Sequence, residues 1–171
     1  MSEGSTLLTS EREVLTWSAF GVGIRELAGM VVDSSFEPDI VLGIARGGLI
    51  PAGAIAYAID CKNLFTVNVE FYTGVNERLD VPIMLPPVLN AGDLDEARVL
   101  IVDDVADTGR TLELVHDFCA GHVAEARTAV IYAKPHSVIS CDYAWRHTER
   151  WINFPWSSEP PLRRRIGLTD S

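Results

Sequence analysis

The sequence predicts an α/β fold built on a central, mostly parallel β-sheet flanked by helices. Two apolar runs, IVLGIA at 40–45 and RVLIVDD at 98–104, lack polar alternation and so indicate strands buried on both faces. Strand-like and helical segments alternate along the chain, which is typical of parallel strands joined by right-handed crossovers. A length of 171 residues, of which 47% are apolar, is enough for one globular domain over residues 1–171.

A helix over about residues 11–33 is predicted near the start of the chain. Ser10 and Glu13 have the spacing of a capping box, and apolar residues then recur at helical spacing. Gly21 and Gly23 predict a break within this helix, because glycine has a low helix propensity.

The remaining segments continue the alternation of strands and helices. β-Branched and aromatic residues indicate a strand at 63–72. The mixture of Pro, Gly, Asn and charged residues at 73–97 predicts a long excursion rather than a compact turn. The other predicted elements are a helix at 49–59, a helix at 111–122 and a strand at 126–134.

Composition and charge argue against several classes of function. A net charge of −10 and a pI near 4.7 disfavour nucleic acid as a partner, because neutralising phosphates requires a basic surface. No apolar run is long enough to span a membrane, and the first residues lack the apolar core of a signal peptide, so we expect no membrane association and a cytoplasmic location. The three cysteines have the spacing of neither a disulfide framework nor a zinc site, so we expect free thiols.

Three motifs directly follow predicted strands: GIARGG at 43–48, VDDVADTGRT at 102–111 and AKP at 133–135. Ligands of open α/β sheets bind outside the carboxyl ends of the strands, so the three motifs are expected to share one edge. The side chains gathered there would be Arg46, Asp103, Asp104, Asp107, Thr108, Thr111 and Lys134. This edge is therefore the candidate binding site.

The stretch Asp107-Thr-Gly-Arg-Thr can bind a phosphate group at the start of a helix. Gly109 lets the backbone approach the anion, Thr108 and Thr111 offer hydroxyls, and the helix N-terminus adds N–H groups and a positive dipole end. The preceding pair of aspartates would repel a phosphate unless hydroxyl groups or Mg²⁺ lay between them, which favours a phosphorylated ribose as the ligand. The alternative is that Thr108 only caps the helix and that the aspartates form a solvated strand end.

The sequence VLIVDDVADTGRTL at 99–112 resembles the phosphoribosyl-pyrophosphate motif of the type I phosphoribosyltransferases. GIARGGLIPA, at 43–52, is similar to the pyrophosphate loop of the same family. The resemblance implies the type I phosphoribosyltransferase fold, with a flexible active-site loop at about 73–97 that closes over the site. It also implies a small hood formed by the termini, whose base-binding segment would lie at about 134–160.

The resemblance further implies roles for individual residues. Asp103 and Asp104 would hold the ribose hydroxyls, directly or through Mg²⁺ as the cofactor. Arg46 and Gly47 would contact the pyrophosphate, beside a cis peptide bond near Ala45-Arg46. The residues around the 5′-phosphate would be Asp107, Thr108, Gly109, Arg110 and Thr111.

The segments YAKPHSV and DYAWRHTERWINFPW are similar to bacterial xanthine–guanine enzymes. By this resemblance Lys134 would bind the 6-oxo group of a purine, Trp151 would stack on the base, and Ile152 would offer backbone groups. Read without the resemblance, Lys134 can equally be a solvated side chain. Trp145, Trp151 and Trp156 can equally be aromatic residues of the core or of a subunit interface.

The resemblance implies a Mg²⁺-dependent pentosyltransferase of purine salvage. It would transfer the 5-phosphoribosyl group from phosphoribosyl pyrophosphate to hypoxanthine, guanine or xanthine, with Asp107 as the catalytic residue that handles the N7 proton. Asn153 and Ser157 stand where relatives carry acids, so the preferred base stays open. Two alternatives also stay open, namely transfer to another base and a non-catalytic phosphoribosyl-pyrophosphate sensor. The habit of the family further implies a homo-oligomer, a dimer or a tetramer.

Overall fold

The structure is a computed structural model that describes residues 12–72, 81–85 and 91–163. Its helices are α1 (Trp17–Asp33), α2 (Leu49–Ala58), α3 (Ala91–Leu94) and α4 (Arg110–Ala120). Its strands are β1 (Glu13–Val14), β2 (Ile40–Ala45), β3 (Leu64–Tyr72), β4 (Val81–Leu85), β5 (Arg98–Ala106), β6 (Glu125–Ala133), β7 (Tyr143–His147) and β8 (Ile152–Asn153).

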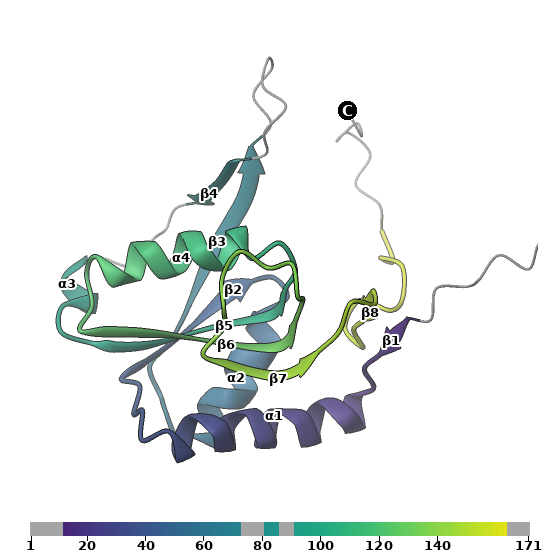
Figure 1. The fold of residues 1–171 in the computed structure, drawn as a ribbon, viewed down its shortest axis with the longest axis horizontal. Coiled ribbons are helices and arrows are strands. Elements are labelled where there is room, and N and C mark those ends of the chain that lie inside the picture. Colours follow the sequence, from purple (N-terminus) through teal and green to yellow (C-terminus); the bar gives the residue numbers. More distant parts are fainter. Residues whose placement is uncertain (1–11, 73–80, 86–90, 164–171) are drawn as a thin grey trace, which may run out of the picture.

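Six strands form one sheet in the order β4-β3-β2-β5-β6-β7 (Figure 1). Neighbouring strands run parallel, except that β4 pairs antiparallel with β3. The two apolar runs without alternation become β2 and β5, the central pair of this sheet. The predicted α/β fold with a mostly parallel sheet is therefore confirmed.

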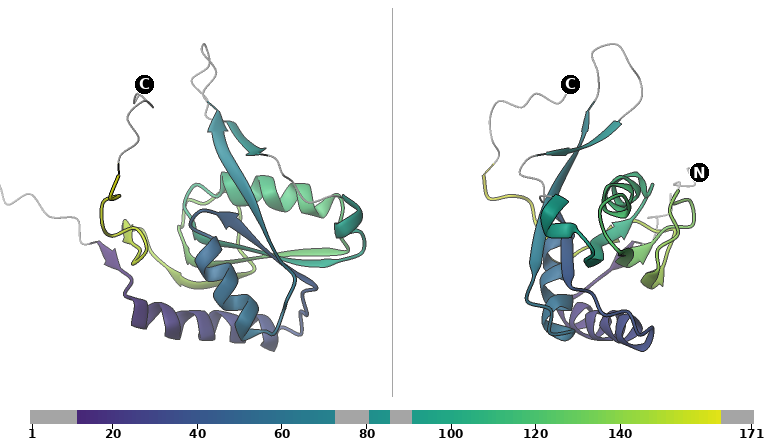
Figure 2. Two further views of the ribbon diagram at one scale, coloured as in Figure 1. Left: turned by 180° about the vertical axis from the view of Figure 1, so that it is seen from behind. Right: turned by 90° about the vertical axis from the view of Figure 1, so that its left-hand side faces the viewer.

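Helices cover both faces of the sheet, α1 and α2 on one face and α4 with α3 on the other (Figures 1 and 2). β5 contributes side chains to the core on both faces of the sheet, because successive side chains of a strand point to opposite faces. Leu100 and Val102 belong to the cluster with α1 and α2, whereas Val99 and Ile101 belong to the cluster with α4. Full burial stabilises each of these side chains by about 1.5–3 kcal/mol, so an uninterrupted apolar strand belongs at the centre.

α1 begins at Trp17 rather than near residue 11, so the predicted start was wrong. Thr16 is the N-cap, and its hydroxyl accepts a hydrogen bond from the backbone N–H of Ala19 at 3.1 Å. Glu13 is extended and lies opposite Ile152 in the pairing of β1 with β8. Because it takes part in a strand, Glu13 is not the third residue of a helical capping box.

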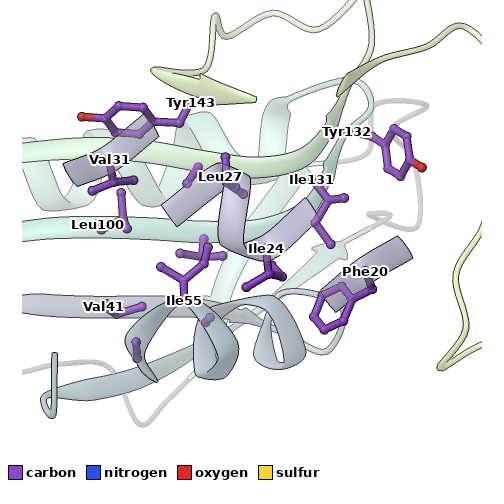
Figure 3. Packing of buried hydrophobic residues seen from close by; sticks show 14 of the residues in the cluster. Phe20, Ile24, Leu27, Val31, Val41, Ile55, Leu100, Ile131, Tyr132 and Tyr143 are labelled. Atoms are coloured by element: carbon purple, nitrogen blue, oxygen red, sulfur yellow. The ribbon is translucent and has the colours of Figure 1, made fainter. Parts of the chain in front are cut away.

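The predicted break at Gly21 and Gly23 is also absent, since α1 runs unbroken through both residues. Tertiary packing outweighs the low helix propensity of glycine at this place. The α1 side chains that point toward the sheet in Figure 3 are Phe20, Ile24, Leu27 and Val31. Gly23 lies against the indole ring of Trp145, where a Cβ would come within 2.7 Å of a ring carbon.

The excursion predicted at 73–97 falls partly outside the described residues. Its described parts are β4, which returns along β3, and α3, whose Leu94 is fully buried beneath α4. The flexibility of this segment and its closure over the site stay predictions. Within the described ranges, no helix is both long and apolar enough to cross a membrane. The free state predicted for the cysteines is confirmed for Cys61, Cys119 and Cys141.

The two ends of the described chain meet beside the carboxyl edge of the sheet. β1 runs parallel to β8, and β7 leads toward this small two-stranded sheet (Figure 1). The backbone N–H of Glu13 donates to the carbonyl of Trp151 at 2.9 Å, and that of Leu15 donates to the carbonyl of Asn153 at 3.0 Å. We call the part formed by residues 12–14 and 151–158 the hood. The resemblance implied a hood formed by the termini, but β1, β7 and β8 were not predicted as strands from the sequence.

Candidate active site

The turn after β2 packs closely against the end of β5. The peptide bond between Ala45 and Arg46 is cis, at the position that the resemblance implied. Gly47 lies so near the side chain of Asp104 that a Cβ on this glycine would be 2.1 Å from Oδ2. Arg46, Gly47 and Asp104 line one cavity of about 600 Å³. Two motifs that are distant in the sequence thus share one side of the site.

The adjacent carboxylates of β5 occupy opposite faces of the sheet, as the alternation along the strand requires. Asp104 lines the cavity beside Arg46, on the side of α1 and α2. Asp103 lines a different cavity, which lies beside the start of α4. The backbone N–H of Asp104 donates to Oδ1 of Asp103 at 2.9 Å, and that of Val105 donates to Oδ1 of Asp104 at 2.8 Å.

Burial makes both of these carboxyl groups harder to ionise. Desolvation raises the pKa of Asp103 well above its ordinary value, and the neighbouring charge of Asp104 raises it further. Desolvation also raises the pKa of Asp104, while hydrogen bonds from the backbone N–H of Val105 and the side chain of Trp156 act in the opposite direction. A cation or hydroxyl donors placed at these oxygens would favour the charged forms.

The connection between β5 and α4 encloses a cavity of about 350 Å³, which we call the loop cavity. Its lining includes Asp103, Asp107, Thr108, Gly109, Arg110 and Thr111. Gly109 is the N-cap of α4 with φ 79°, and a Cβ there would lie 2.2 Å from Oγ of Ser137. The cap has no side chain, and Oγ1 of Thr108 reaches the backbone N–H of Arg110 only at 3.5 Å. The first N–H groups of α4 are thus placed to bind an anion.

His136 also lies at this site, although it was not among the site residues expected from the sequence. Its Nε2 lies 2.9 Å from Oδ1 of Asp107. The side chain of His136 is 60% exposed and that of Asp107 is 50% exposed. Lys134 was expected at the carboxyl edge of the sheet because it directly follows a strand. His136 lies only two residues later, so the same expectation applies to it.

A second cavity of about 350 Å³, which we call the hood cavity, lies between the sheet edge and the hood. Its lining comprises Arg12, Val105, Asp107, Lys134, Trp151, Ile152, Asn153, Phe154, Ser157 and Ser158. Asp107 therefore lines both the hood cavity and the loop cavity. Lys134 is only 8% exposed, and its Nζ donates to the carbonyls of Arg150 at 2.7 Å and Glu149 at 3.4 Å. An ammonium group has three donors, so one is left for a ligand.

The tryptophans that the sequence left ambiguous differ in their surroundings. Trp151 is 64% exposed and lines the hood cavity. Trp145 packs against the main core, and its indole N–H donates to Glu26 at 2.6 Å. Trp156 stacks on Phe154 and lines the cavity that contains Arg46. Of the three, Trp151 is the one available to a ligand beside Lys134.

Ile152 presents its backbone to the side of β8 that faces away from β1. The pairing with β1 uses the carbonyls of Trp151 and Asn153. In a parallel ladder, alternate residues bond to opposite sides, so the N–H and C=O of Ile152 point the other way. Since Ile152 also lines the hood cavity, these groups are available to a ligand there.

Comparison with known proteins identifies the family. Residues 10–161 match the family described as the phosphoribosyl transferase domain. The chain belongs to this family. A xanthine-guanine phosphoribosyltransferase of Gluconobacter oxydans is 30% identical over 98% of this chain and 99% of its own length. Another, from Nitratidesulfovibrio vulgaris, is 35% identical over 85% of this chain and 84% of its own length.

A solved structure supports the same family. The crystal structure of a purine phosphoribosyltransferase from Pyrococcus horikoshii has a TM-score of 0.76 and 35% identity, covering 90% of this chain and 99% of that one. The predicted type I phosphoribosyltransferase fold and the predicted enzyme class, a phosphoribosyltransferase, are therefore confirmed.

Proposed function

We propose that this phosphoribosyltransferase transfers the 5-phosphoribosyl group of phosphoribosyl pyrophosphate to a 6-oxopurine, giving a nucleoside 5′-monophosphate and pyrophosphate. The observation that carries the proposal is that Asp107 lines two adjoining cavities. One is the loop cavity, which suits a sugar phosphate, and the other contains Lys134 and an exposed Trp151, which suit a base. A ribose bound in the first would meet a purine bound in the second at Asp107.

Each part of the sugar donor has a fitting group in this family member. The 5′-phosphate would accept hydrogen bonds from the backbone N–H groups and hydroxyls of residues 107–111. The ribose hydroxyls would donate to the carboxylates of Asp103 and Asp104. The pyrophosphate would lie at Arg46 and Gly47, in the cavity that contains Asp104.

The base would bind between the hood and the sheet edge. Lys134 would donate its remaining N–H to the 6-oxo group, and the exposed ring of Trp151 would stack on the purine. Aromatic stacking contributes on the order of 1–3 kcal/mol per base. The backbone N–H and C=O of Ile152 would bind the edge of the purine that carries N1.

The pair of aspartates also fits Mg²⁺, the cofactor that the family resemblance implies. Carboxylate oxygens are the ligands that this cation prefers, and its charge would offset the cost of ionising two partly buried neighbours. Among the described residues, no three His, Cys, Asp or Glu side chains form a metal-binding group. The chain would supply one or two ligands and the substrate the others, as is common for Mg²⁺. When bound, the cation would neutralise charge on the departing pyrophosphate.

Asp107 is the proposed catalytic residue. As N9 of the base forms its bond to C1′ of the ribose, the bond from C1′ to the pyrophosphate oxygen breaks, and the N7 proton passes to the Asp107 carboxylate. Positioning and electrostatic stabilisation supply the rest of the rate enhancement, without a covalent intermediate on the protein. General acid–base catalysis of this kind contributes about 10²- to 10⁴-fold.

Pyrophosphate release tests the proposed reaction. The protein is incubated with MgCl₂, phosphoribosyl pyrophosphate and one of hypoxanthine, guanine, xanthine, adenine or uracil, and the nucleotide product is identified by mass spectrometry. We expect turnover with at least one of the three 6-oxopurines and none with uracil. Turnover with adenine or uracil alone would mean that the base assignment is wrong.

The main competing proposal is a sensor that binds phosphoribosyl pyrophosphate without turning it over. Silence with all five bases, together with calorimetric binding of phosphoribosyl pyrophosphate, would favour it. In the enzyme, Asp107→Asn should lower turnover by about 10²- to 10⁴-fold and leave that binding largely intact. Asp117→Asn, on an exposed part of α4, is the matched control and should change neither.

We also propose that the protein forms a homo-oligomer, a dimer or a tetramer. α2 and β3 present exposed apolar side chains that include Leu49, Tyr57 and Phe65, and Tyr57 is 94% exposed. Sedimentation at twice or four times the 18.8 kDa chain mass would agree with this, and sedimentation as a single chain would contradict it. The cytoplasmic location and the lack of nucleic-acid or membrane partners stay predictions.

A further inference from the structure

Arg12, just before β1, lines the hood cavity together with residues that come much later in the chain. The pairing of β1 with β8 places it there, because Glu13 lies opposite Ile152 in the register. Its Nη1 donates to Oδ1 of Asn153 at 3.2 Å. None of the roles proposed above explains a guanidinium group at this end of a base-binding cavity.

This end of the hood cavity is rich in hydrogen-bond donors. A guanidinium group has five N–H donors and no acceptor. The hydrogen bond from Arg12 is accepted by the amide oxygen of Asn153, so the amide NH₂ group of Asn153 is a further donor. Among the described residues that line this cavity, Asp107 is the sole carboxylate, whereas Arg12 and Lys134 both carry positive charge. A ligand group facing Arg12 would therefore be best matched if it accepts hydrogen bonds.

The shape of a purine determines which of its atoms would face Arg12. O6 and N7 are neighbours on the ring system, and Lys134 and Asp107 are their proposed partners. C2 lies across the six-membered ring from C5, the atom that carries N7. A base held by Lys134 and Asp107 therefore directs C2 toward the opposite wall of the cavity, which the hood residues Arg12 and Asn153 help to form.

We propose that Arg12 is a specificity-determining residue that binds an oxo group at C2 of the base, so that the site favours xanthine. The inference rests on the proposed transfer to 6-oxopurines and deepens it. The C2 oxo group of xanthine accepts hydrogen bonds, whereas the C2 amino group of guanine donates them and would oppose the guanidinium. Hypoxanthine carries only hydrogen at C2, so it serves as the reference base.

The test is the ratio of kcat/KM for xanthine to kcat/KM for hypoxanthine, measured in several variants. Arg12→Met should lower this ratio by at least about tenfold, the smallest effect expected from losing one hydrogen bond to a charged group. The corresponding ratio of guanine to hypoxanthine should not fall. Arg12→Lys, which keeps the charge, should retain part of the preference for xanthine. Arg25→Met removes the same charge from an exposed position on α1 and should behave as wild type.

Several outcomes would overturn the assignment. An unchanged ratio in Arg12→Met would do so, and so would an equal loss for all three bases, because that pattern marks a structural role. If Arg12→Met does not fold, as judged by thermal unfolding, the same ratio in Arg12→Gln decides. If wild type turns over none of the 6-oxopurines, the proposed function itself is wrong. If it turns them over and the ratio does not respond to residue 12, only the role of Arg12 is wrong.

Discussion

Replacing Gly47 by alanine tests whether the turn after β2 and the end of β5 act as one site. The new Cβ would lie 2.1 Å from Oδ2 of Asp104 and 2.5 Å from its Cγ. Contacts of this kind are essentially never shorter than 3.0 Å, so the carboxylate has to move by about 0.9 Å or the turn has to shift by as much. Asp104 resists this movement, because its Oδ1 accepts a hydrogen bond from the Val105 N–H at 2.8 Å.

A displacement of this size has a large expected effect on catalysis. Misplacing reacting groups by about 1 Å can cost about 10²-fold in rate, which corresponds to about 2.7 kcal/mol of transition-state free energy. We therefore expect Gly47→Ala to lower kcat/KM for phosphoribosyl pyrophosphate about 100-fold. The assay is steady-state pyrophosphate release at saturating base, with circular dichroism to show that the variant is folded.

Gly53→Ala is the matched control, because a Cβ at this position on α2 would meet nothing within 4 Å. This variant should be as active as wild type and more stable by about 0.5–1 kcal/mol, the usual gain when alanine replaces glycine within a helix. A folded Gly47→Ala variant with wild-type kcat/KM would contradict this expectation. It would show that the close approach of Gly47 to Asp104 does not matter for the reaction.

Three further predictions concern other parts of the site and the core. Gly109→Ala should lower the free energy of unfolding by at least about 1–2 kcal/mol in urea titrations, because φ is 79° and the Cβ would collide with Ser137. His136→Ala should lower kcat about tenfold, because it removes the contact that orients Asp107. His136→Gln keeps an N–H donor and should retain most of the wild-type kcat. Equal losses of kcat in both variants would contradict this role. Burial raises the pKa of Cys119 from its ordinary 9.0 to about 11, so this thiol should resist iodoacetamide at neutral pH in mass-spectrometric mapping, and rapid labelling of the folded protein would contradict its burial. The contribution of the neutral thiol to stability is complete below pH 9.0 and should disappear as the pH rises through about 11.

The central sheet was predictable because its signals are local. The apolar run at 40–45 became β2 with the same limits, since burial on both faces leaves no room for polar residues. The start of α4 next to Gly109 was predictable for a similar reason, because a glycine between two threonines directly after an apolar strand is a local signal in the sequence. The rule that ligands bind at the carboxyl ends of strands then brought Arg46, Asp107 and Lys134 to one edge.

The hood was less predictable because its contacts join distant parts of the chain. β1 has only two residues, and nothing local in Glu13 indicates that it pairs with Ile152 rather than beginning a helix. The place of Arg12 in the hood cavity depends on that pairing and was missed with it. By contrast, the separation of Asp103 from Asp104 into two cavities follows from strand alternation alone, so the sequence could have predicted it.

The proposed site is tested most directly by a crystal structure of the protein with a purine nucleoside 5′-monophosphate. We expect the phosphate against the N–H groups of residues 108–111, the ribose hydroxyls at Asp103 and Asp104, and the base stacked on Trp151 beside Lys134. A nucleotide bound with its phosphate outside the loop cavity, or with its base outside the hood cavity, would contradict the proposed site.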